Sequence, residues 1–93
     1  MPTQESETSS SASRTLADRV AIVTGAGQGI GRGIALCLAR AGAHIAIAEQ
    51  VPERIASVAA AVEDLGVQAL GIPTDVSRTD EVQRMVRHTM DRF

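Results

Sequence analysis

Four glycines stand within seven residues of the sequence, from Gly25 to Gly31, directly after the short apolar run Val20–Val23. A tight turn from a strand into a helix brings backbone N–H groups and the positive end of the helix dipole to one point. Glycines in such a turn supply unusual backbone angles and omit the Cβ atoms that would block a phosphate. These residues therefore predict a site for the pyrophosphate of a dinucleotide, with plain turn formation as the alternative.

The spacing of the glycines distinguishes between the phosphate-binding patterns. A P-loop counted from Gly25 requires glycine at position 30 followed by lysine, but Ile30 stands there and the chain has no lysine. The dinucleotide pattern G-x-G-x-x-G fails in its strict form for the same reason. The residues instead fit T-G-x-x-x-G-x-G, with Thr24, Gly25, Gly29 and Gly31 in the fixed positions.

The segments around the glycines predict strands that alternate with helices. Strands are expected at Val20–Val23, at Ala43–Ala48 just before Glu49, and within Val67–Val76. The first is expected to be buried, because it is short, apolar and rich in β-branched residues. Pro52 suits the first turn of the helix that follows the second strand.

Three amphipathic helices are expected after these strands, each with an apolar stripe at helical spacing. The first helix ends at Gly42 and the second at Gly66, while residues 77–80 resemble a capping box for the third. Cys37 falls on the first stripe and is expected in the core. The stripes comprise Ile30, Ile34, Cys37, Leu38 and Ala41; Ile55, Val58, Val62 and Leu65; and Val82, Met85, Val86, Thr89 and Phe93. This alternation predicts an α/β fold with a parallel sheet.

From about residue 16 to residue 93, the sequence resembles the short-chain dehydrogenase/reductase family. Three features carry the resemblance in order: the motif TGAGQGIG, the segment AGAHIAIAE with its terminal acid, and the TDV of residues 74–76. It implies a Rossmann-like doubly wound parallel sheet, of which the chain holds the first βαβαβα half, incomplete. It also implies that Asp75 binds the adenine amino group and that Val76 lines the adenine pocket. The cofactor-binding residues expected in the glycine motif are Gly25, Gln28, Gly29, Ile30 and Gly31.

Glu49 lies eighteen residues after Gly31, close to the separation of about 20 expected for an acid that binds the adenosine ribose. Its carboxylate would accept hydrogen bonds from the ribose hydroxyls and repel a 2′-phosphate. Resemblance to the family places the basic residues of NADP enzymes at positions held here by the neutral Gln28 and Gln50. The predicted cofactor is NAD. NADP stays the alternative because Arg54 can also approach the ribose.

The family resemblance implies chemistry by a tyrosine, a lysine, a serine and an asparagine. The chain has no tyrosine, lysine or asparagine, so no catalytic residue is assigned in it. His44 and His88 are expected at the surface. The first hypothesis is the N-terminal portion of an NAD(P)-dependent oxidoreductase that interconverts an alcohol and a ketone. The alternative is a truncated, non-catalytic nucleotide-binding fragment or a regulatory module. In either case the first strand is expected to form an exposed apolar edge.

The composition excludes some classes of partner and indicates how the chain is divided into domains. The net charge of −2 argues against nucleic-acid and anionic-membrane surfaces, and no apolar run approaches the roughly 20 residues of a membrane span. Residues 1–15 are rich in serine and threonine and predict a disordered tail, which leaves residues 16–93 as part of one dinucleotide-binding domain. A single cysteine fits a cytoplasmic protein. No metal site is predicted, and the family resemblance implies a homo-oligomer with a small-molecule substrate.

Overall fold

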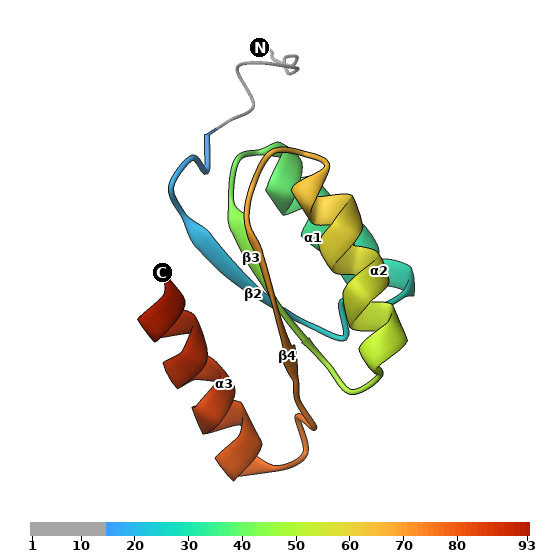
Figure 1. The fold of residues 1–93 in the computed structure, drawn as a ribbon, viewed down its shortest axis with the longest axis vertical. Coiled ribbons are helices and arrows are strands. Elements are labelled where there is room, and N and C mark those ends of the chain that lie inside the picture. Colours follow the sequence, from blue (N-terminus) through green and yellow to red (C-terminus); the bar gives the residue numbers. More distant parts are fainter. Residues whose placement is uncertain (1–14) are drawn as a thin grey trace, which may run out of the picture.

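The computed structural model describes residues 15–93, and the predicted tail at residues 1–15 falls almost entirely outside that range. Strands and helices alternate along the chain, as predicted (Figure 1). The strands are β2 (Val20–Thr24), β3 (His44–Glu49) and β4 (Ala69–Pro73), and the helices are α1 (Gly29–Arg40), α2 (Pro52–Glu63) and α3 (Thr79–Arg92).

The three strands form one parallel sheet in the order β2–β3–β4. Thr24 pairs with Ala48, and Glu49 pairs with Pro73, so all three strands end at the same edge of the sheet. Parallel strands need a crossover, and each connection here contains one helix. The carboxyl edge therefore collects the turns that lead into α1, α2 and α3.

The helices cover both faces of the sheet, with α1 and α2 on one side and α3 on the other (Figure 1). Side chains along β3 alternate between these faces. Ile45 and Ile47 belong to the larger core with α1 and α2, whereas Ala48 packs with Ile72 and Met85 on the α3 side. This three-layer arrangement confirms the predicted Rossmann-like α/β fold in its incomplete form.

The ends of the helices follow the sequence signals only in part. Pro52 begins α2, and Gly42 follows α1 with a φ of 104°, as a glycine after a helix end should. The capping box predicted at residues 77–80 is wrong. Helix α3 has Arg78 at its N-cap without a side-chain hydrogen bond, because the Ser77 hydroxyl bonds to Asp75 instead.

The stripe predicted for α1 is wrong in part, although its member Leu38 packs against the core. The helix lays Ala35 and Ala39 on the sheet, while Ile30, Ile34 and Cys37 are exposed. Small side chains let the helix backbone come close to the strands, and Ile30 and Ile34 point outward. Cys37 is therefore a surface thiol and not a core residue.

Strand β2 is less buried than predicted. Val20 and Ile22 are 39% and 40% exposed, and only Val23 is buried. The reason is the strand's place in the sheet: β2 pairs with β3 on one side and lies at the sheet edge on the other. This outcome matches the exposed apolar edge expected for an incomplete sheet.

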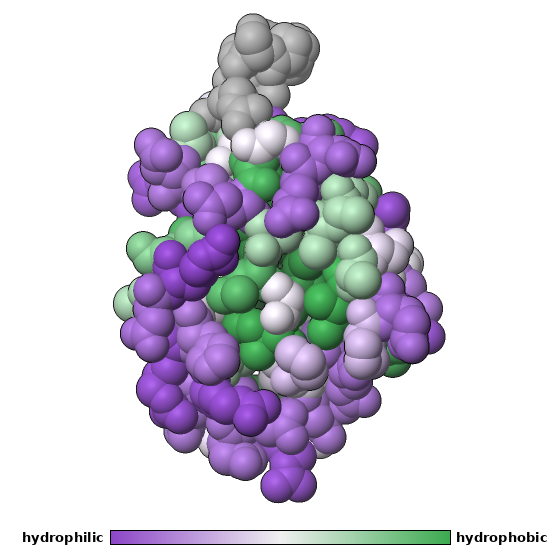
Figure 2. Space-filling view, viewed as in Figure 1, coloured by the Kyte–Doolittle hydropathy of each residue, from purple (hydrophilic) through white to green (hydrophobic). Residues whose placement is uncertain are grey.

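The apolar edge of the incomplete sheet is also exposed at the molecular surface. Figure 2 shows apolar side chains gathered in the middle of one face and bordered by hydrophilic ones. Between β2 and the end of α3 lies an apolar groove of about 330 Å³, lined by Val20, Ile22, Thr89, Met90 and Phe93. Within residues 15–93, no helix has the length and apolar character needed to cross a bilayer.

Candidate functional site

The turn between β2 and α1 is held against the neighbouring strand at the carboxyl edge of the sheet. The Gly25 N–H donates to the carbonyl of Ala48 at 3.0 Å. Gly25 and Gly29 have φ values of 63° and 59°, a region that other residues rarely adopt. A Cβ built on either glycine would meet nothing within 4 Å. The two glycines thus combine a tight turn with an open approach to the backbone.

Gly31 has a different role in the same motif. A Cβ at this position would strike the carbonyl oxygen of Gly25, because the first turn of α1 packs directly on the end of β2. Glycine here permits the close packing that sets the helix N-terminus over the turn.

The N-terminus of α1 is suited to an anion. Its N-cap residue, Gln28, has an extended backbone and makes no side-chain cap, and the first turn contains no acidic residue. The first N–H groups of a helix lack intrahelical partners and carry the positive end of the dipole. Ile30, 84% exposed, extends from this turn. Arg32, the one basic residue of the turn, is half-buried.

Glu49 ends β3 opposite this turn, with a side chain only 9% exposed. Its Oε1 accepts the N–H of Gly27 at 3.2 Å, and its Oε2 accepts those of Gln50 and Val51 at 3.0 and 3.2 Å. Burying a carboxylate is costly unless its oxygens accept such hydrogen bonds. The Arg54 guanidinium lies 3.9 Å from Oε2, but it is nearly half exposed and contributes little. Backbone N–H groups therefore fix the position of this carboxylate.

A small cavity of about 130 Å³ lies where the turn, β3 and the end of β4 meet. Three of the predicted site residues line it together, namely Gly25, Glu49 and Val76. The predicted residues at positions 28–31 do not line it and lie on the turn and the first turn of α1. The full lining is Gly25, Ala48, Glu49, Gln50, Thr74 and Val76.

Thr74 belongs to this cavity, although its place in the sequence suggested no role for its side chain. It is buried, donates its hydroxyl to the carbonyl of Ile72 at 2.8 Å, and donates its N–H to the carbonyl of Glu49 at 3.0 Å. The N–H bond fastens the end of β4 to the end of β3, and the hydroxyl bond is local to the end of β4. Its position just before Asp75, at a strand end, was the available signal.

Asp75 lies beside the cavity without lining it. Its Oδ1 accepts the hydroxyl and the N–H of Ser77, and its own N–H donates to Glu81. The Ser77 hydroxyl, helped by the Ser77 N–H, the Gln50 side chain and the charge of Arg78, lowers the pKa of Asp75 against an opposing effect of burial. The aspartate is thus held charged, and its contact with adenine stays a prediction.

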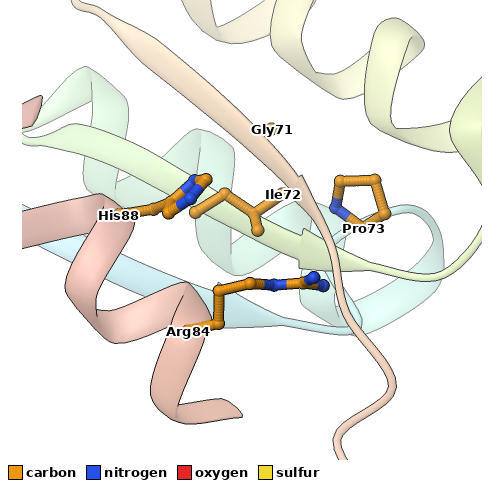
Figure 3. A pocket seen from close by; sticks show the side chains of 5 residues that line it. All are labelled: Gly71, Ile72, Pro73, Arg84 and His88. Carbon is orange, nitrogen blue, oxygen red and sulfur yellow. The ribbon is translucent and has the colours of Figure 1, made fainter. Parts of the chain in front are cut away.

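A larger cavity lies elsewhere, between β4 and α3. Its volume is about 360 Å³, and its lining includes His88 and Arg84, which extend from α3 alongside Ile72 (Figure 3). None of the predicted site residues lines it. His88 is exposed, as expected, and His44 is half-buried with its Nδ1 accepting the N–H of Gln68. Size alone therefore does not identify the functional site of this chain.

Known proteins resemble this chain in both sequence and fold. A short chain dehydrogenase/reductase of Aspergillus oryzae, astE, is 50% identical over 80 residues, which cover 85% of this chain and 31% of the relative. The solved structure of L-sorbose reductase from Gluconobacter frateurii, complexed with NADPH and L-sorbose, matches with a TM-score of 0.80 and 32% identity, covering 84% of this chain and 30% of that one.

Carveol dehydrogenase from Mycobacterium avium, solved in complex with NAD, matches with a TM-score of 0.79 and 27% identity, covering 83% of this chain and 32% of that one. The chain thus spans about a third of the length of the relatives it matches. The short chain dehydrogenase family itself matches over residues 19–93, which is nearly the whole described part. The chain belongs to the short-chain dehydrogenase/reductase family of oxidoreductases.

Proposed function

We propose that this chain binds a nicotinamide dinucleotide as the N-terminal portion of an oxidoreductase that interconverts an alcohol and a ketone. One observation carries the proposal: an uncapped helix N-terminus follows a glycine-rich turn that is open at Gly25 and Gly29, next to a fixed carboxylate at the end of the adjacent strand. The related sorbose reductase and carveol dehydrogenase structures, with NADPH and NAD respectively, support a cofactor of this class.

The pyrophosphate would lie over the turn, where Gly25 and Gly29 leave the backbone accessible. The N–H groups at positions 28–31 would donate to it together with the dipole of α1. When bound, the cofactor supplies or accepts the hydride, and the protein supplies its position and electrostatic surroundings. Asp75 and Val76 are proposed for the adenine, at the end of β4.

NAD is the proposed cofactor because Glu49 places a negative charge where a 2′-phosphate would lie. A carboxylate has about four lone-pair positions, and three N–H groups occupy three of them here. One remains for a ribose hydroxyl. Gln28, at the N-cap of α1, and Gln50, which lines the cavity, add no positive charge. The two structural relatives bind different dinucleotides, so the preference rests on Glu49.

A second candidate function follows from the composition. The chain contains no tyrosine, lysine or asparagine, so the general acid that the family resemblance implies is absent from it. A non-catalytic nucleotide-binding fragment or regulatory module would show the same dinucleotide affinity. Neither hypothesis predicts turnover by this chain alone, so the coding sequence downstream of Phe93 separates them. The family's tyrosine, lysine, serine and asparagine there would favour the enzyme, and a stop codon would favour the module.

Calorimetric titration of the full chain with NAD and with NADP tests the cofactor proposal. NAD is expected to bind more tightly. Glu49→Gln should reduce the ratio of NAD to NADP affinity by about tenfold, because the neutral amide no longer repels the 2′-phosphate. Glu63→Gln removes an exposed charge at the end of α2 and is the matched control. Tighter binding of NADP, or no binding of either dinucleotide, would overturn the proposal.

A further inference from the structure

The cavity between β4 and α3 lies apart from the proposed dinucleotide site and shares no lining residue with the cavity at Glu49. Its volume of about 360 Å³ falls in the range of pockets that bind small molecules. Ile72 and Pro73 form an apolar wall on the β4 side, and Arg84 and His88 line the α3 side. The cavity thus joins an apolar surface to two basic side chains.

The two basic side chains face the cavity without a partner of opposite charge. Arg84 and His88 lie one turn apart on α3, so they share a face of the helix. Figure 3 shows both extending toward β4. Neither forms an ion pair with another residue of the described range 15–93. The acids one turn before Arg84, which are Asp80 and Glu81, pair with Arg78 instead. The Arg84 guanidinium is therefore available to an external anion.

The edge of β4 adds a backbone donor to the cavity. Gln68 accepts the N–H of Ile45, and Thr74 donates its own N–H to the carbonyl of Glu49. The peptide groups at positions 68 and 74 therefore point toward β3. Successive peptide groups of a strand point in opposite directions, and Gly71 lies three residues from each of these positions. Its N–H thus points to the outer edge of β4, which has no further strand beside it in the described sheet.

The chemistry of the lining selects one kind of ligand. A guanidinium presents paired donors that match the two oxygens of a carboxylate. The apolar wall favours an anion with a hydrocarbon body over a bare inorganic ion. Asp91 lines the adjoining cavity together with His88, and its carboxylate would repel a second negative charge on the ligand.

We propose that the cavity between β4 and α3 binds a small organic monocarboxylate. The carboxylate lies at Arg84 and His88, and the hydrocarbon body lies against Ile72 and Pro73. The Gly71 N–H is a further donor at the strand edge. This binding site is separate from the dinucleotide site and does not depend on the proposed function.

NMR titration of the full chain with hexanoate tests the site, with the ring signals of His88 as the reporter. The second histidine of the chain, His44, is an internal control, because its ring stacks on Phe93 and does not line the cavity. Hexanoate should shift the His88 signals until they saturate and leave those of His44 unchanged. Inorganic phosphate lacks the hydrocarbon body, and adipate carries a second carboxylate at the same chain length. Each should bind at least about tenfold more weakly than hexanoate.

Arg84→Gln should weaken hexanoate binding about tenfold, because it removes charge-assisted hydrogen bonds to the carboxylate. Arg87→Gln is the matched control, since it removes the same charge from an exposed residue of α3 that does not line the cavity. It should change the affinity less than about twofold, because solvent screens a charge at that position. Both arginines are exposed, so neither change should disturb the fold.

Equal losses in the two variants would show an effect of net charge alone and overturn the site, as would His88 signals that do not respond to hexanoate. Phosphate or adipate that binds as tightly as hexanoate would overturn the monocarboxylate assignment. The titration contains no dinucleotide. A chain that binds hexanoate but neither NAD nor NADP would therefore contradict the proposed function and still support this site.

Discussion

The hydroxyl of Ser77 donates a hydrogen bond to Oδ1 of Asp75 at 2.6 Å, and the Ser77 N–H donates to the same oxygen at 2.9 Å. The two bonds close a local turn between the end of β4 and the start of α3. Side chains of this kind commonly bond to backbone groups two residues away. Here the turn also sets the ionisation of a residue proposed to face adenine.

Ser77→Ala should raise the pKa of Asp75 part of the way back to its ordinary value of 3.8, because the hydroxyl bond is its largest cause of lowering and the N–H bond remains. NMR titration of the Asp75 carboxyl measures this. A lowered folded-state pKa stabilises the fold above the ordinary pKa, and that contribution is lost as the pH falls through the folded-state pKa. The difference in stability between the two proteins should therefore be present at neutral pH and disappear in acid.

Ser57→Ala is the matched control for this change, because Ser57 is an exposed serine on α2. It should leave the titration of Asp75 unchanged. An unaltered Asp75 pKa in Ser77→Ala would show that the hydroxyl does not hold the carboxylate.

Gly31→Ala should destabilise the chain by about 1–3 kcal/mol, because its Cβ would strike the carbonyl oxygen of Gly25. Gly33→Ala, two residues along the same helix, has open space and should stabilise by about 0.5–1 kcal/mol through helix propensity. Urea unfolding followed by circular dichroism measures both. Similar effects of the two substitutions would contradict the close packing of α1 on the turn.

Ile45→Ala should lower the free energy of unfolding by about 2–5 kcal/mol, because Ile45 is fully buried between the sheet and the helices α1 and α2. Ile34→Ala removes the same atoms from a side chain that is 48% exposed and should cost less than about 1 kcal/mol. Urea unfolding of the two variants gives the comparison. Equal losses would mean that α1 presents a different face to the sheet.

Cys37 should react with a soluble thiol reagent under native conditions at nearly the rate found in denaturant, because its side chain is exposed on α1. Absorbance of the released thiolate from Ellman's reagent follows the reaction. Protection that ends only on unfolding would restore the buried position predicted from the sequence.

The strand and helix order could be predicted from the sequence because the glycines and the short β-branched runs mark each change of direction. The face of α1 that packs on the sheet could not be predicted in this way. Its large apolar residues Ile30 and Ile34 suggested one stripe, but the sheet accepts the small residues Ala35 and Ala39. Helical spacing shows that α1 has apolar stripes. Which of them is buried depends on how closely the helix packs on the sheet.

The candidate site was likewise only partly predictable from the sequence. The position of Glu49 at a strand end follows from sequence spacing. Its bond to Gly27 depends on the register of β2 against β3, which pairs residues far apart in the chain. Likewise, the spacing of residues 77–80 predicted a helix cap, but the Ser77 hydroxyl instead donates to Asp75 in a local turn.

The order of strands in the sheet equals their order in the chain. During synthesis on the ribosome, each new strand therefore pairs beside the strand made just before it. Strand β3 needs only β2, and β4 needs only β3. Growth of the sheet can thus proceed in one direction, from β2 outward through β4, as the chain leaves the ribosome.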